Sequence, residues 1–283
     1  MERRGESAGI GVDHIGGPIA WREAGDRSKS PVLFLHGLGG SRLAWEPQLE
    51  GLSHRFRCIA WDLPGYGASE PLPHLTFPAI ADAVVRLLDT LGLDRVDLVG
   101  LSFGGQQVQH VALAHPDRVR GLVLSDTSAS FGADGTDADA WMRLRLDPLD
   151  AGVTPAEMAA PVLDSITGPR FGGHERDRLL HAFAQIPSDG LRAAVTCLPT
   201  HDVVARLGDI GAPTLVIVGD LDDETPMSYA EALASGIPDA RLAIVEGAGH
   251  LTPTEAPNDF NTLVEQFLTT ISGRAGTSRA PTR

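Results

Sequence analysis

Short apolar runs alternate with longer segments of helical periodicity along most of this 283-residue chain. Near-continuous apolar runs of four to eight residues are typical of strands that are buried on both faces. Because parallel strands need a crossover between them, the alternation predicts an α/β fold with a mostly parallel central sheet flanked by helices. The predicted buried strands are residues 31–35, 56–61, 96–99, 120–125, 214–218 and 241–245.

Residues that typically end or cap helices support this assignment of strands and helices. Residues 19–22 are expected to form an antiparallel edge strand near the start. Gly92 and Pro116 end two predicted helices, and Thr254 is expected to cap the last one. The predicted core helices are residues 77–91, 103–115, 228–235 and 256–271.

One interval, from about Ser130 to Leu207, contains no strand-like run. It predicts a helical lid, residues 130–207, inserted into an α/β core of residues 1–129 and 208–273, with a flexible tail at 274–283. The expected lid helices are residues 138–146, 155–166 and 175–186. The residues expected to interrupt them are Pro148, Gly168, Pro169, Pro187 and Gly190.

Ser102 is the middle residue of Gly100-Leu101-Ser102-Phe103-Gly104, directly after a predicted strand and directly before a predicted helix. A Gly-x-Ser-x-Gly turn in that position holds its serine in a strained conformation with the hydroxyl projecting above the sheet. The sequence therefore predicts Ser102 as a nucleophile, which needs a base and a third group to orient that base.

His250 is the predicted base. It follows the last predicted strand in the small-residue loop Gly247-Ala248-Gly249-His250, at the sheet edge where open α/β sheets keep their sites. Four other histidines fit surface or core positions at least as well as a catalytic role: His110, His115, His181 and His201.

The predicted acid is Asp222, in the segment 219–226 that follows the strand 214–218. This segment carries four carboxylates, and composition alone does not separate Asp220 from Asp222. Asp126, at the end of the preceding strand, is a further alternative because a carboxylate there also reaches a histidine in this architecture.

Taken together, these motifs resemble the α/β-hydrolase superfamily, in the order Ser, Asp, His and across roughly residues 17–271. The resemblance rests on His36-Gly37-Leu38-Gly39-Gly40, on Asp62-Leu63-Pro64-Gly65-Tyr66-Gly67-Ala68-Ser69, on the turn at Ser102, on Gly219 with Asp222, Thr225 and Pro226, and on Gly249-His250. It implies Asp222 as the acid and the backbone N–H groups of Leu38 and Phe103 as oxyanion donors, with Gly39 as a substitute. Within the superfamily the chain is most similar to 3-oxoadipate enol-lactonases, through residues 100–106, 122–128, 202–207 and 212–217.

The resemblance implies a serine hydrolase that cleaves a small ester or lactone through an acyl-enzyme, without metal or organic cofactor. Two alternatives stay open: a hydrolase of carbon–carbon bonds in aromatic degradation, and a non-catalytic small-molecule receptor on the same fold. Serine at position 102 disfavours dehalogenase or epoxide-hydrolase chemistry, for which aspartate is expected there.

Several side chains are candidates for the substrate pocket. The apolar ones are Trp45, Phe103, Phe131, Trp141 and Leu251. If the substrate carries a carboxylate, the lid offers arginines, although each arginine fits a solvated surface at least as well; they are Arg143, Arg145, Arg170, Arg176, Arg178 and Arg192. His36 and Asp62 are expected to brace loops beside the site.

The formal net charge of -14 argues against nucleic acid or an anionic membrane as a partner. The partner that the resemblance implies is a small-molecule substrate. Cys58 and Cys197 are expected to be separate buried thiols, as in a cytoplasmic protein. No apolar run is long enough to span a bilayer, and residues 1–7 lack the apolar core of a signal peptide. The oligomeric state stays open.

Overall fold

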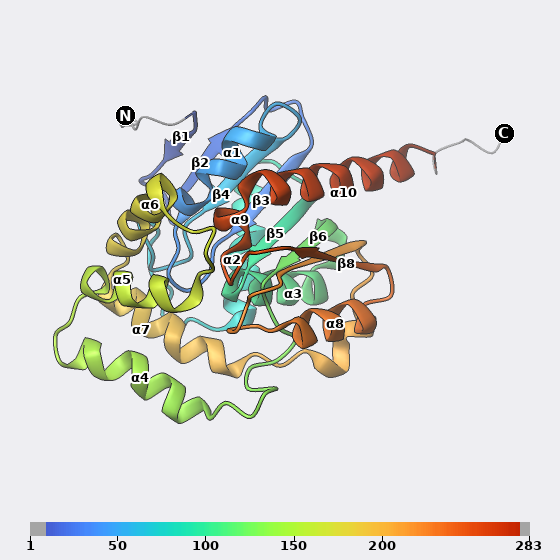
Figure 1. Ribbon diagram of the computed structural model, residues 1–283. Coiled ribbons are helices and arrows are strands. Elements are labelled where there is room, and N and C mark those ends of the chain that lie inside the picture. Colours follow the sequence, from blue (N-terminus) through green and yellow to red (C-terminus); the bar gives the residue numbers. More distant parts are fainter. Residues whose placement is uncertain (1–9, 278–283) are drawn as a thin grey trace.

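An eight-stranded sheet with helices on both faces forms the centre of the molecule in the computed structural model, which describes residues 10–277 (Figure 1). The strand order is β1-β2-β4-β3-β5-β6-β7-β8. β2 is antiparallel to both of its neighbours, β1 and β4. All other neighbouring pairs in this order are parallel. The strands are β1 (Val12–His14), β2 (Trp21–Ala24), β3 (Pro31–Leu35), β4 (Arg57–Trp61), β5 (Val96–Leu101), β6 (Val119–Ser125), β7 (Thr214–Gly219) and β8 (Ala240–Val245). The predicted fold class is confirmed.

Two predictions about the ends of the sheet are wrong. The segment predicted as an edge strand corresponds to β2, which is paired on both sides, and the edge is instead β1, which is too short to show a pattern. The run 241–245 was expected to be buried on both faces. It lies in β8, the opposite edge strand, where Ile244 is 55% exposed.

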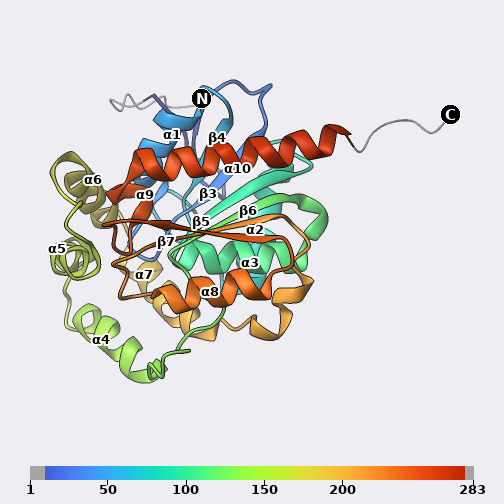
Figure 2. The same ribbon diagram turned by 45° about the vertical axis from the view of Figure 1, so that its right-hand side comes forward.

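The core helices cover the sheet in two layers (Figure 2). Helices α1 and α10 pack on one face, and α2, α3 and α8 pack on the other. Each layer buries its own apolar cluster against the sheet, which places most of the hydrophobic stabilisation there. The core helices are α1 (Glu46–Leu52), α2 (Phe77–Thr90), α3 (Phe103–Ala114), α8 (Met227–Gly236), α9 (Thr252–Glu255) and α10 (Pro257–Thr277).

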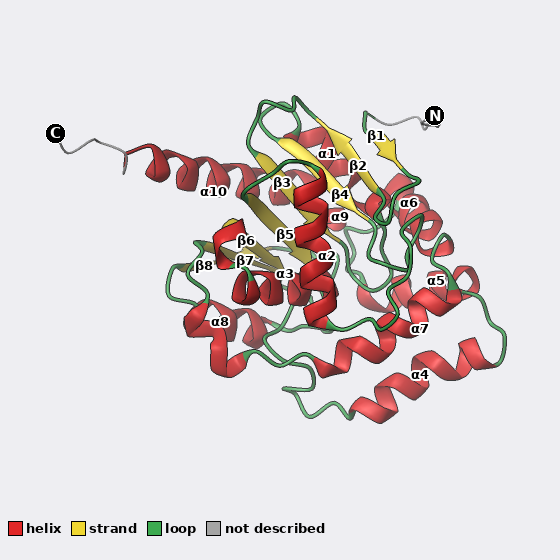
Figure 3. Cartoon of the chain, turned by 180° about the vertical axis from the view of Figure 1, so that it is seen from behind, coloured by secondary structure: helices red, strands yellow, loops and turns green. Residues whose placement is uncertain are grey.

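Four helices lie between β6 and β7 in the chain and gather on one side of the sheet (Figure 3). They are α4 (Ala138–Asp150), α5 (Pro155–Ile166), α6 (Gly173–Ala184) and α7 (Ser188–Cys197). An isolated antiparallel bridge between Ser130 and Asp202 joins the two ends of this segment. Its division from the core as a separate lid remains a prediction.

The helix breaks expected at Pro148 and Gly190 are wrong. Pro148 lies within the last turn of α4. Gly190 lies in the first turn of α7, a helix that the sequence did not predict, and a Cβ on it would stand 2.1 Å from the carbonyl oxygen of Gly65. The glycine therefore permits a close approach between α7 and the core and does not interrupt the helix.

The C-terminal helix also differs from the prediction. Thr254 lies inside the short helix α9, and α10 starts only at Pro257, so Thr254 does not cap it. α10 continues to Thr277 and takes up the start of the expected tail. The rest of the tail, 278–283, and the N-terminal residues 1–9 lie outside the described residues. Between residues 10 and 277, no helix combines the length and the apolar character that crossing a membrane requires.

Candidate active site

Ser102 occupies a strained turn between β5 and α3. Its φ of 53° is one of two positive values at non-glycine residues in the described chain. The turn is tight because a Cβ on Gly104 would stand 2.0 Å from the carbonyl oxygen of Leu35. The Ser102 N–H donates to the carbonyl oxygen of Ser125, at the end of the neighbouring strand, over 2.9 Å. These contacts fix the hydroxyl at the carboxyl edge of the sheet.

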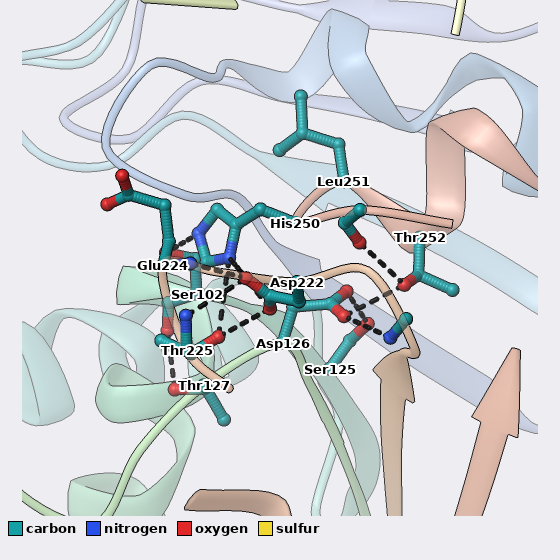
Figure 4. A network of polar contacts seen from close by, with 12 residues as sticks. Ser102, Ser125, Asp126, Thr127, Asp222, Glu224, Thr225, His250, Leu251 and Thr252 are labelled. Atoms are coloured by element: carbon teal, nitrogen blue, oxygen red, sulfur yellow. Dashed lines mark hydrogen bonds and ion pairs between the residues drawn. The ribbon is translucent and has the colours of Figure 1, made fainter. Parts of the chain in front are cut away.

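His250 and Asp222 meet Ser102 at this edge (Figure 4). The His250 Nε2 atom lies 2.9 Å from the Ser102 Oγ atom, and its Nδ1 atom lies 3.0 Å from Oδ2 of Asp222. The carboxylate accepts further hydrogen bonds from the Thr225 hydroxyl (2.7 Å) and from the N–H groups of Glu224 and Thr225 (2.9 Å each). The three predicted side chains therefore form one continuous hydrogen-bonded chain.

The charged forms of His250 and Asp222 stabilise each other. Burial opposes the charged form of His250, but the Asp222 carboxylate outweighs burial and raises the pKa of His250 to about 9. Burial likewise opposes ionisation of Asp222, yet the facing imidazole and the donors from Thr225 leave its pKa lowered. The site therefore stabilises an imidazolium against a carboxylate.

The other two acid candidates lie elsewhere. Asp220 accepts a hydrogen bond from the Gly247 N–H over 2.6 Å. Asp126 is buried below the site and accepts from Ser125, Gly219 and Thr252. Within residues 10–277, Asp222 is the only carboxylate that hydrogen-bonds the His250 ring.

The rival histidines are distributed over the fold. His110 pairs with His201 (3.1 Å), His115 pairs with Asp82, and His181 is exposed on α6. His36 accepts the N–H of Leu63 through Nε2 and contacts its neighbour's carbonyl through Nδ1, which braces two loops as expected. Asp62 has the same kind of role, accepting from Arg42 and Ala68.

The N–H groups proposed for the oxyanion are available. Phe103 is the first residue of α3, where a backbone N–H has no partner within the helix. Leu38 lies in the loop after β3, and its carbonyl oxygen accepts from the Tyr66 hydroxyl. In the described part of the chain, neither N–H donates to a backbone or side-chain acceptor.

A cavity of about 440 Å³ opens above Ser102 and His250. It is lined by four of the five apolar residues predicted for the pocket, which are Trp45, Phe131, Trp141 and Leu251. Phe103 does not line it, because its side chain points into the core and packs edge-on against Phe77. Gln106 and Ser128 add polar groups to the wall that the sequence did not indicate.

The six candidate arginines divide clearly. Four of them form ion pairs: Arg170 with Asp259, Arg176 with Asp164, Arg178 with Glu175 and Arg192 with Asp150. Arg143 is exposed and does not line the cavity.

Arg145 is the exception among these arginines. It lines the cavity, its Cζ atom lies 3.9 Å from the centre of the Trp141 ring, and its Nη1 donates to the Trp141 carbonyl oxygen over 3.2 Å. Burial lowers its pKa, against the opposing effect of Glu224. Over residues 10–277, no three histidine, cysteine, aspartate or glutamate side chains gather in a way that would hold a metal ion.

Comparison with known proteins matches a family model to each half of the chain. Residues 30–153 match the family described as alpha/beta hydrolase fold, and residues 194–278 match the family described as TAP-like protein. A provisionally named carbamate hydrolase, RutD, of Caulobacter sp. (strain K31) is 33% identical, with 89% of this chain and 93% of that protein covered. 3-Oxoadipate enol-lactonase 2 of Acinetobacter baylyi is 28% identical, with 86% and 90% covered.

The solved structures agree with this assignment. A hydrolase from Pseudomonas aeruginosa PA01 superimposes with a TM-score of 0.82 at 31% identity, covering 93% of this chain and 99% of that one. Its likeness extends over sheet and inserted helices alike, because nearly the whole of both chains is matched. The chain therefore belongs to the α/β-hydrolase fold family and is a hydrolase of that fold.

Proposed function

We propose that the protein hydrolyses an ester or lactone of a small organic molecule, with Ser102 as nucleophile, His250 as base and Asp222 as the acid. The single observation that carries this proposal is the unbroken contact from the Ser102 hydroxyl through His250 to Asp222 at the floor of a cavity. A serine needs this arrangement because its hydroxyl is a weak nucleophile at neutral pH.

The reaction proceeds in two halves. His250 Nε2 takes the proton of Ser102 as its oxygen attacks the carbonyl carbon, and the N–H groups of Leu38 and Phe103 bind the oxyanion. The imidazolium then gives that proton to the departing alkoxide or enolate oxygen, which leaves an acyl-serine. Water, deprotonated by His250, attacks the acyl carbon, and the imidazolium then gives that proton to the departing Ser102 oxygen, which releases the acid and restores the Ser102 hydroxyl.

The relatives define which bonds to test. The names of two of them refer to an enol-lactone and to a carbamate, and both substrates present a carbonyl to a serine. Carbon–carbon hydrolysis of a diketone uses the same three residues, and a receptor on this fold binds a ligand without turnover. A panel of lactones, short esters, carbamates and vinylogous diketones separates these outcomes.

Labelling with a fluorophosphonate, followed by peptide mass spectrometry, tests the nucleophile. We expect the label on Ser102, and we expect Ser102→Ala to lose both labelling and hydrolysis of an activated ester while its circular dichroism is unchanged. Asp222→Asn should lower turnover by orders of magnitude, about 10⁴-fold where the same change reverses the imidazole tautomer. Full activity in Ser102→Ala would reject the assignment.

The surroundings of the protein complete the proposal. Cys58 and Cys197 are both buried free thiols, which supports a reducing, cytoplasmic environment. The acidic composition supports a small-molecule substrate over nucleic acid or an anionic membrane.

A further inference from the structure

Asp126 directly follows β6 and is the other non-glycine residue with a positive φ, at 47°. Its side chain is 1% exposed, so an ionisable group is held below the site in a conformation that costs free energy. Residues of this kind persist where the surrounding structure over-determines them, most often at functional sites.

The Asp126 carboxylate joins the segments that carry Asp222 and His250 to the end of β6, which lies beside the Ser102 turn (Figure 4). Oδ2 accepts the hydroxyl of Ser125 (2.7 Å), whose carbonyl oxygen in turn holds the N–H of Ser102. Oδ1 accepts the Gly219 N–H (3.0 Å), three residues before Asp222, and the Thr252 hydroxyl (2.8 Å), two residues after His250. One side chain thus ties the ends of β6 and β7 to the loop after β8.

The carboxylate also acts through its charge. Burial, and then the neighbouring Asp222 carboxylate, raise the pKa of Asp126 to about 7. In the other direction, Asp126 adds to Asp222 and Glu224 in raising the pKa of His250. Glu255, another carboxylate beside the His250 loop, accepts the backbone N–H groups of Gly249 and Leu251.

We propose that Asp126 is a positioning residue of this site: it fixes the segments that carry Asp222 and His250 relative to the end of β6, and its negative charge stabilises the imidazolium form of His250. The inference rests on the proposed function, in which His250 is the base. It differs from the role of Asp222, because no hydrogen bond joins Asp126 to the His250 ring.

Asp126→Asn separates the charge from the shape. The amide oxygen still accepts from Gly219 and Thr252, and the NH₂ group donates to Ser125. Without the negative charge at position 126, the His250 imidazolium loses its proton more readily. The acidic limb of the pH profile of kcat/KM should therefore move to lower pH by about one unit, which is at the small end of the pKa shifts that a nearby charge causes. Turnover on the plateau should fall less than about tenfold, far less than for Asp222→Asn.

Asp220→Asn is the matched control, because this aspartate is exposed and lies in the same loop as Asp222, where it accepts only the Gly247 N–H. It should leave the acidic limb where it is. Thr252→Val keeps the Asp126 charge and removes its link to the His250 loop. We expect Thr252→Val to lower turnover, while the acidic limb of its kcat/KM profile stays within a few tenths of a pH unit of that of the parent protein.

The proton affinity of His250 can also be read without any substrate. A nitrogen NMR titration of the His250 ring, assigned by its loss in His250→Gln, should give a lower pKa in Asp126→Asn than in the parent protein. This readout stays informative if the substrate panel fails, so failure of the two proposals can be told apart. An unchanged ring pKa in Asp126→Asn, a loss of turnover as deep as in Asp222→Asn, or unaltered turnover in Thr252→Val would overturn the inference.

Discussion

At the scale of single residues, Arg145 is the cation that the cavity presents to a bound molecule. Its guanidinium stacks on Trp141, donates only to a backbone carbonyl, and has no carboxylate within ion-pair distance in the part of the chain that the structure describes. A half-buried guanidinium with free donors binds a carboxylate through charge-assisted hydrogen bonds.

We therefore expect Arg145→Gln to raise the KM for esters that carry a carboxylate by about tenfold to a hundredfold, since a hydrogen bond to a charged group contributes about 1.5–3 kcal/mol. The KM for neutral esters should change little. Steady-state kinetics on a matched pair of esters, one anionic and one neutral, measures the difference.

Arg143→Gln is the control, because Arg143 is exposed on the same helix and lies outside the cavity. The acidic residues on the cavity wall, Asp134, Asp223 and Glu224, oppose an anionic substrate. If Arg145→Gln raises the KM of the anionic and the neutral ester equally, the acidic residues dominate the electrostatics of the cavity, and Arg145 serves to pack Trp141.

Ser102, His250 and Asp222 could be grouped from the sequence because each one follows a recognisable apolar run. Parallel strands end at one edge, so residues far apart in the chain are brought together there. Arg145 could not be distinguished from the other five arginines, because its lack of an acidic partner depends on which tertiary neighbours it meets. The same holds for Asp126, whose donors come from β6, β7 and the loop before α9.

At the scale of elements, the turn at Ser102 depends on α3 lying close beneath β3. Gly104 is the contact point, since a Cβ there would overlap the Leu35 carbonyl, a backbone atom that cannot rotate away. Gly104→Ala should therefore destabilise the protein by about 1–3 kcal/mol or more, as overpacking does elsewhere. Urea unfolding followed by circular dichroism measures this loss.

Gly208→Ala is the matched control, because a Cβ at Gly208 meets nothing within 4 Å. We expect its free energy of unfolding to stay within about 0.5 kcal/mol of the parent protein. Equal stability of the two variants would mean that the turn at Ser102 adjusts freely, and would contradict the tight packing of α3 on β3.

The elements that the sequence did not reveal share a physical cause. β1 has three residues, too few for any period to show, and α7 begins around a glycine that normally disfavours a helix. In both cases tertiary packing decides: pairing with β2 for the strand, and the approach to Gly65 for the helix. The long buried strands needed no such context, because their apolar runs are local.

At the scale of the whole molecule, the buried His201 and the half-buried His110 connect the segment of α4–α7 to the core. His201, which follows this segment, donates from Nε2 to the carbonyl oxygen of Ser128, which precedes it, over 3.0 Å. Its Nδ1 must then accept, so His110 on α3 donates from Nε2 across 3.1 Å. Phe77 of α2 stacks on His110 at a ring separation of 4.2 Å.

This pair should make the fold sensitive to acid. Burial lowers the pKa of His110 to about 4, with a contribution from Arg206, and burial together with His110 lowers the pKa of His201 to about 3. In the unfolded chain both rings titrate near 6.5. Stabilisation by the neutral pair is therefore complete above about pH 6.5 and is lost as the pH falls toward 4, because the unfolded state binds more protons there.

We expect the melting temperature to decline between pH 6.5 and 4, and the decline to be shallower in His110→Gln, whose amide keeps a donor for His201 but does not titrate. His115→Gln, at a half-buried histidine directly after the same helix and outside the His110–His201 pair, should leave the slope unchanged. Thermal unfolding across this range compares the three proteins. A charge on the His110–His201 pair, which lies where the inserted helices meet the core, must cost stability because the pair is largely removed from water. If the melting temperatures of all three proteins fall with pH at the same slope, the acid sensitivity of the fold comes from other groups.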